Sequence, residues 1–332
     1  MKYVKVCVVL LAILIFIAGA LLTPRPYTET EFSMDTVMTV TAYGKNAKTA
    51  VKEVFSRIRE LDKKLDLRNP ESQVARLNQA PANTPVYLDE DVFYVIKTAL
   101  LFSEKCGGAF DITLYPVSNL WGFGTDKAMV PRAEDIQNAL LKTGRQNLIL
   151  DEATQTITKK HSAVQIDLGG VAKGYAADEA IRILKEAGIT SAYLDLGGNI
   201  GIIGEKPLSL RETIENGKSS RPYTVGIQKP GAPRGELIDT VSLSEGFVVT
   251  SGDYERFFEE EGILYHHILN PETGFPADTG LKSVTIVSKS GILADMLSTT
   301  IFVQGKESAN RYVNDCETIL LVDDHFDLTC IE

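Results

Sequence analysis

A carboxylate and a hydroxyl four residues apart are the first candidates for chemistry. Asp295 and Thr299 stand at i and i+4 within an apolar stretch, residues 291–303, so they share one face if this stretch is a helix. Together they present two hard oxygen ligands, the type that Mg²⁺ prefers. An ordinary helix start is the alternative, because the helix dipole also favours an aspartate in the first turns.

The second candidate is a glycine-rich segment, Asp167-Leu-Gly-Gly-Val-Ala-Lys-Gly174. Its order of strand end, glycine turn and helix start is typical of phosphate sites at helix N-termini, although it matches neither a P-loop nor a dinucleotide fingerprint. Lys173 would then meet a phosphate; without one it is a solvated lysine. The sequence Asp-Leu-Gly-Gly, which begins this segment, occurs again at residues 195–198. The second copy is either another turn of similar structure or a coincidence.

Two adjacent histidines, His266 and His267, are the third candidate. Neighbouring side chains in a strand point to opposite faces, so at most one of them faces a site. The sequence contains neither a Gly-x-Ser-x-Gly elbow nor a His-Glu-x-x-His pair, and readings as a hydrolase or a zincin therefore lack support.

The composition limits the ligands. The chain has 332 residues, 44% of them hydrophobic and 23% charged, with a formal net charge of −10. This balance is typical of a globular protein, and its acidity opposes binding to nucleic acids. A small phosphate-bearing ligand stays compatible if a cation helps to hold it.

The N-terminus predicts the location. Residues 6–22 carry no charge and follow Lys2 and Lys5. Seventeen apolar residues reach the lower limit for a membrane span, and the preceding lysines favour a body on the extracytoplasmic side. Ala18-Gly19-Ala20 has the form of a signal-peptidase site, so secretion after cleavage is the alternative. We expect an anchor or signal segment at residues 1–22, a tether at 23–31 and one domain at 32–332.

Hydrophobic periodicity predicts the elements that position these residues. Helices are expected at residues 51–65, 89–106, 131–141, 172–187 and 292–303. Strands are expected at residues 34–43, 193–196, 201–203, 223–228, 237–243, 247–250, 264–269 and 284–287. Because strands often follow strands, we expect an α+β fold with mixed, largely antiparallel sheets flanked by helices.

Two further segments lie outside this pattern. The polar residues 205–221 are predicted to be an exposed loop. Cys316 and Cys330 flank an expected C-terminal hairpin, so they either pair or are simply small buried residues.

Taken together, seven motifs in one order resemble the ApbE-type flavin transferases, or FAD:protein FMN transferases, over most of the body. They are Met34-Asp-Thr36, Gly108-Ala-Phe-Asp111, the segment from Asp167 to Asp178, Tyr193-Leu-Asp-Leu-Gly-Gly-Asn199, Thr250-Ser-Gly-Asp-Tyr254, His267-Ile-Leu-Asn-Pro-Glu-Thr-Gly274 and Ala294-Asp-Met-Leu-Ser-Thr299.

The resemblance implies a Mg²⁺-dependent reaction in which FAD is cleaved, FMN is joined through phosphate to a threonine of an acceptor redox protein, and AMP leaves. It implies metal ligation by the Gly170 carbonyl, Asp295 and Thr299, and it suggests that His267 removes the threonine proton. The implied FAD contacts are Met34, Ala109, Phe110, Asp111, Asp167, Lys173 and the segment at Leu269.

One departure from the family pattern concerns flavin stacking. Many members have a tyrosine near the position of Arg68, just before Glu71-Ser72, and an arginine there stacks or pairs with phosphate instead. Two other functions use the same features: hydrolysis of the FAD pyrophosphate, and flavin binding without catalysis.

Overall fold

The computed structural model describes residues 25–332. The predicted anchor or signal segment, residues 1–22, lies outside the described residues. Among the helices that the structure describes, none is both long enough and apolar enough to cross a bilayer.

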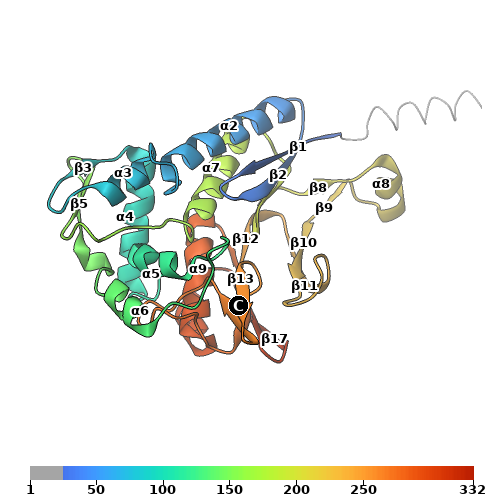
Figure 1. The fold of residues 1–332 in the computed structure, drawn as a ribbon. Coiled ribbons are helices and arrows are strands. Elements are labelled where there is room, and N and C mark those ends of the chain that lie inside the picture. Colours follow the sequence, from blue (N-terminus) through green and yellow to red (C-terminus); the bar gives the residue numbers. More distant parts are fainter. Residues whose placement is uncertain (1–24) are drawn as a thin grey trace, which may run out of the picture.

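One eight-stranded sheet forms the centre of the molecule (Figure 1). Its spatial order is β1-β2-β6-β7-β12-β15-β16-β17, and every neighbouring pair is antiparallel. This arrangement confirms the predicted α+β class. The strands span Pro26–Ser33 (β1), Thr36–Tyr43 (β2), Ala192–Leu196 (β6), Asn199–Ile203 (β7), Glu245–Gly252 (β12), Leu281–Ser288 (β15), Thr318–Asp323 (β16) and Leu328–Ile331 (β17).

Three helices cover one face of this sheet: α2 (Ala47–Leu65), α7 (Ala172–Glu186) and α9 (Gly291–Gln304) (Figure 1). Most residues of α9 are buried, because it packs against both α7 and strands β12 and β15. A helix that is apolar on nearly every side needs such a position. Thr299 is one of the few α9 side chains that stay partly exposed.

A hairpin of β10 (Tyr223–Gln228) and β11 (Leu237–Leu243) covers the middle of the opposite face. Its apolar side chains bury a second core against Ile200, Ile202, Val248 and Leu320. On the same face, β1 and β2 carry paired threonines, whose hydroxyls approach to 2.9 and 3.0 Å.

The chain between α2 and α7 forms a helical lobe with a small sheet in the order β3-β5-β4. Its helices are α3 (Gln73–Gln79), α4 (Glu90–Lys105), α5 (Tyr115–Trp121) and α6 (Ala133–Leu140). Its strands are β3 (Val86–Tyr87), β4 (Leu148–Asp151) and β5 (Thr156–Lys159). In the chain, a second hairpin follows β12 and precedes β15. It consists of β13 (Phe257–Glu260) and β14 (Ile263–His266).

Three predicted segments differ in the structure. The expected tether, residues 23–31, overlaps β1, because its alternating residues pair with β2 and Pro26 begins an edge strand, where its missing N–H is tolerated. The expected loop, residues 205–221, contains β8 (Lys206–Pro207), α8 (Leu210–Asn216) and β9 (Ser220–Arg221). The strand expected at 264–269 ends at His266, because Ile268 and Leu269 turn to pair with residues 276–277.

The helix α8 begins with a capping box: Ser209 and Glu212 each bond to the other's backbone N–H. The sequence Ser209-Leu-Arg-Glu212 carries the signature of this motif within a polar stretch. At the C-terminus, Cys316 and Cys330 are both free thiols in the structure.

Candidate active site

The candidate residues gather at one end of the sheet, where β2 and β15 begin and β6 and β12 end. Asp295 lies in the second turn of α9 and is buried. Its Oδ2 accepts a hydrogen bond of 2.8 Å from the backbone N–H of Gly174, in the first turn of α7. The carboxylate therefore lies at the positive end of the α7 dipole.

Two glycines allow α7 and α9 to approach closely enough for this bond. A Cβ atom on Gly174 would lie 2.4 Å from the carbonyl oxygen of Gly291. Asp178, one helical turn further along α7, accepts hydrogen bonds from the N–H groups of Gly291 (2.7 Å) and Ile292 (2.9 Å). Each helix thus supplies an aspartate that caps the start of the other.

The structure places Gly170 close to Thr299. A Cβ atom on Gly170 would come within 3.1 Å of the Phe110 ring and 3.9 Å of Thr299 Oγ1. Thr299 Oγ1 lies 3.3 Å from Ser251 Oγ and 3.4 Å from the carbonyl oxygen of Asp295. The hydroxyls of Thr299 and Ser251, which lie side by side, are oxygen ligands of the kind that Mg²⁺ prefers.

These residues fit a small cation that prefers oxygen. In the described part of the chain, Oδ1 of Asp295 has no hydrogen-bond partner, and it is not among the fully buried unpaired atoms, so it keeps some exposure to solvent. Within residues 25–332, no group of three or more His, Cys, Asp or Glu side chains could hold a metal ion. A cation here would therefore rely on one carboxylate, a hydroxyl, backbone carbonyls and phosphate oxygens.

Two more predicted residues are linked through their backbone. Asp111 accepts hydrogen bonds from the N–H (2.8 Å) and the hydroxyl (2.6 Å) of Thr113 and begins a short 3-10 helix, Ile112–Leu114. The carbonyl oxygen of Ile112 then accepts from the N–H of Asp167 (2.8 Å). Burial raises the pKa of both the Asp111 and the Asp167 carboxyl groups.

Three cations surround Asp167. Arg256, Lys173 and Arg68 each act to lower its pKa, against the larger opposite effect of burial. Lys173 Nζ reaches the carbonyl oxygen of Gly169 at 3.4 Å. An acidic protein thus concentrates positive charge at the end of the sheet that holds the glycine-rich turn, which suits a phosphate ligand.

The two histidines have different surroundings, and only His266 belongs to β14. His266 is buried, and its Nε2 lies 3.1 Å from the carbonyl oxygen of Ala277. The Nδ1 of His267 lies 3.2 Å from the carbonyl oxygen of Arg256, which also accepts from the His267 N–H (3.0 Å). A carbonyl oxygen only accepts, so Nδ1 carries the proton and the lone pair of Nε2 is left to act as a base.

Burial, with the charges of Arg256 and Lys173, lowers the pKa of His267 to about 3. His267 is therefore neutral near pH 7. In the unfolded chain it takes up a proton near its ordinary pKa of about 6.5. The unfolded state binds more protons between these values, so the stability that neutral His267 contributes is complete above about pH 6.5 and is lost as the pH falls toward 3.

We expect the free energy of unfolding of His267→Gln to fall less between pH 7.5 and pH 4.5 than that of the wild-type protein. Urea titrations at the two pH values measure both. The difference between the two proteins isolates His267 from Asp111, Asp167 and Asp178, whose raised pKa values act in the opposite direction. Parallel declines would show that His267 is not held neutral.

Three further predicted FAD contacts lie in different surroundings. The side chain of Leu269 is buried in an apolar cluster with Val117, Trp121 and Ile136, so only the backbone of its segment can meet a ligand. Met34 lies in the β1–β2 turn, and its N–H bonds to Asp62 Oδ2 (3.1 Å). Ala109 is partly exposed beside buried Phe110.

Sequence reasoning missed Arg256, Asp178 and Ser251 as parts of this site. Arg256 follows the predicted motif Thr250–Tyr254 by two residues, and no spacing rule connects it to His267. Ser251 lies in that motif, and its position 2.8 Å from Ser298 Oγ depends on the packing of β12 against α9.

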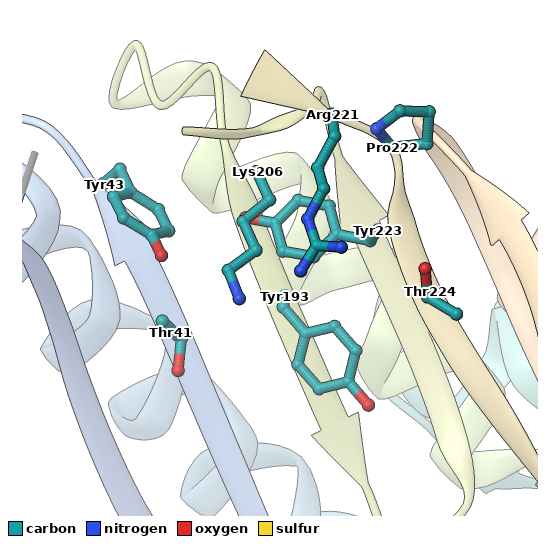
Figure 2. A pocket seen from close by; sticks show the side chains of 8 residues that line it. All are labelled: Thr41, Tyr43, Tyr193, Lys206, Arg221, Pro222, Tyr223 and Thr224. Atoms are coloured by element: carbon teal, nitrogen blue, oxygen red, sulfur yellow. The ribbon is translucent and has the colours of Figure 1, made fainter. Parts of the chain in front are cut away.

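A hollow of about 290 Å³ lies at the other end of the sheet (Figure 2). It is lined by side chains that include Tyr43, Tyr193, Lys206 and Arg221, and none of the predicted site residues borders it. The register places Tyr43 and Ala192 at the opposite end of β2 and β6 from Thr36 and Leu196. We therefore assign the site by its chemistry rather than by this cavity.

Comparisons with known proteins identify the family of the chain. Residues 34–321 match the model described as the ApbE family. The FAD:protein FMN transferase of Treponema pallidum is 35% identical, with 86% of this chain and 80% of that protein covered. One from Klebsiella pneumoniae is 34% identical, with 81% and 80% covered.

Solved structures give the same result. The ApbE protein of Thermotoga maritima superposes with a TM-score of 0.82 at 34% identity, over 93% of this chain and 97% of that one. The flavinyl transferase ApbE of Pseudomonas stutzeri gives 0.79 at 31%, over 94% and 96%. The chain therefore belongs to the ApbE family.

Proposed function

We propose that this protein is an FAD:protein FMN transferase that joins FMN to a threonine of an acceptor protein. One observation carries the proposal: oxygen ligands and a neutral base meet at the same cationic end of the sheet. Lys173 is close to both groups. Its charge helps to lower the pKa of His267, and it directly precedes Gly174, whose N–H donates to Asp295. The family relationship supports the same activity.

The chain's own residues suit each part of this reaction. The threonine oxygen attacks the phosphorus of the FMN half of FAD, and its proton passes to Nε2 of His267. The bond from that phosphorus to the bridging oxygen breaks, and AMP leaves with that oxygen. Lys173 and Arg256 lie where they offset the phosphate charge. Mg²⁺ held by Asp295, Thr299 and the Gly170 carbonyl would supply Lewis-acid stabilisation of the pyrophosphate.

Incubation of the full-length protein with FAD, Mg²⁺ and a threonine-containing acceptor tests the proposal. We expect the acceptor to gain the mass of FMN less water, and AMP to appear in equal amount. Release of free FMN and AMP with an unmodified acceptor would indicate a pyrophosphatase instead. Recovery of intact FAD bound to the protein would indicate flavin binding without catalysis.

We also propose that residues 1–22 hold the protein at the cell membrane, with its body on the extracytoplasmic side. The uncharged run of residues 6–22 and the preceding lysines support this placement. The acceptor would then be a redox protein exposed on the same side.

Protease added to intact protoplasts should remove the body, and fractionation should leave the full-length chain in the membrane. A soluble product that begins near Leu21 would keep the extracytoplasmic location but replace the anchor with a cleaved signal peptide. A body that resists protease until the cells are lysed would contradict the proposed topology.

A further inference from the structure

The turn between β1 and β2 has an unfavourable backbone for its residues. Ser33 pairs with Thr36, so the loop contains only Met34 and Asp35. Their φ angles are +47° and +64°, a combination that favours Asn-Gly in two-residue hairpin loops. Two consecutive residues other than glycine or asparagine in this region store strain, and such strain often accompanies a functional role.

Contacts that hold the turn in place do not need the Asp35 side chain. The hydroxyl of Ser33 donates to Asp62 Oδ2 at 2.7 Å, and the N–H of Met34 donates to the same oxygen at 3.1 Å. These two bonds fix the turn to α2, and neither would change if Asp35 were glycine.

The carboxylate of Asp35 instead points toward two arginines. Its Oδ2 lies 2.9 Å from Arg256 Nη2, and its Oδ1 lies 3.4 Å from Arg68 Nη1. The side chains of Asp35, Arg256 and Arg68 are 41, 48 and 62% exposed. Ion pairs this exposed contribute little to stability, so they do not explain why a strained aspartate is kept.

Arg256 connects this pair to the histidine. It lies in a bend between β12 and β13, and its carbonyl oxygen accepts both the N–H and the Nδ1–H of His267. The ion pair with Asp35 restrains the guanidinium of Arg256 and so reduces the number of backbone conformations open to this residue. The Arg256 carbonyl therefore keeps the direction that favours the Nδ1–H tautomer of His267. A free bend would release that constraint.

We propose that Asp35 is a positioning residue for the transfer reaction: it holds Arg256 across the mouth of the site and thereby orients His267. This inference rests on the proposed function, in which His267 is the base. Asp35 itself touches neither the ligands nor the reacting atoms in this arrangement.

The test compares Asp35→Gly with Glu261→Gly. Glu261 is the matched control, because it also has a positive φ (+53°) in a two-residue loop, between β13 and β14, and it is exposed. Glycine relieves the backbone strain in both variants. We expect the melting temperature of each to equal or exceed that of the wild-type protein.

Only Asp35→Gly is expected to lose activity, with kcat for transfer reduced about threefold to fivefold, as the modest strength of an exposed ion pair allows, and the affinity for FAD within twofold of the wild type. The ¹⁵N chemical shifts of the His267 ring should report Nδ1–H in the wild-type protein and in Glu261→Gly, and a mixture of tautomers in Asp35→Gly. Asp35→Asn keeps a residue that tolerates the turn but removes the charge, and it should resemble Asp35→Gly in kcat.

Wild-type kcat and an unchanged tautomer in Asp35→Gly would overturn the proposal. A lower melting temperature with a proportional loss of activity would reduce Asp35 to a structural role. Failure of the proposed function gives a different result. A wild-type protein without transfer activity would contradict the proposal that it is a transferase. The ring ¹⁵N shifts would still decide whether Asp35 orients His267.

Discussion

The variant Asp295→Asn is expected to fold normally and to lose FMN transfer by roughly a thousandfold. An asparagine Oδ1 still accepts the hydrogen bond that Gly174 donates to the carboxylate (2.8 Å in the wild type), so the cap of α7 survives. The negative charge does not survive, and it is the only full negative charge assigned to the cation. Asp295→Ala would lose the charge and the cap together, which makes it the less informative variant.

Transfer rates over a range of Mg²⁺ concentrations, with circular dichroism for the fold, measure this prediction. Thr299→Ser is the matched control, because it keeps the hydroxyl beside Gly170, and we expect it to retain most of the activity. Thr299→Ala should lie between the two, since a neutral ligand contributes less than a charged one. A wild-type rate for Asp295→Asn at limiting Mg²⁺ would show that the cation is held elsewhere.

Gly174→Ala is expected to destabilise the protein by about 2–3 kcal/mol or more. In an ordinary helix this change is favourable by up to about 1 kcal/mol. Here the new Cβ would lie 2.4 Å from the Gly291 carbonyl oxygen, 2.7 Å from Ile292 Cα and 2.8 Å from Asp295 Cβ. None of these atoms can rotate away, so α7 and α9 must separate.

Urea unfolding at neutral pH measures the loss. Gly169→Ala is the control for stability, because the nearest atom to its new Cβ is Asp167 Oδ1 at 3.2 Å, at the end of a side chain. The separation of the helices should also weaken the bond between Asp295 and Gly174, so Gly174→Ala is expected to lose activity even where it stays folded. A destabilisation below about 1 kcal/mol would mean that the helices adjust without cost.

Strong periodicity made the larger elements predictable from the sequence. The apolar spacing from Val51 to Leu65 predicted α2, and the helix expected at residues 89–106 is α4, which Asp89 caps by accepting from Val92 N–H at 3.2 Å. The pair Asp295 and Thr299 was placed on one helix for the same reason. Local patterns of this kind depend only on residues within one or two turns.

The parts of the site that were missed depend on contacts between distant segments. Nothing in the local sequence indicates that the Arg256 carbonyl meets His267, or that Asp178 caps a helix that begins at Gly291. For Leu269, the motif predicted a contact with FAD, but the side chain packs in the apolar cluster around Trp121. A motif therefore does not determine which way each of its side chains points. The two Asp-Leu-Gly-Gly segments also differ, since only Gly197 and Gly198 have positive φ angles.

The strands of the large sheet lie side by side in the same order as along the chain. A chain that emerges N-terminus first therefore delivers each strand beside the one already made, and no strand of this sheet has to insert between two others. The pairing of β2 with β6 is delayed, because the whole segment between Tyr43 and Ala192 must be synthesised before β6. Until then, the edge of β2 that pairs with β6 stays unpaired. We expect the closure of the long loop between β2 and β6 to limit the rate of folding.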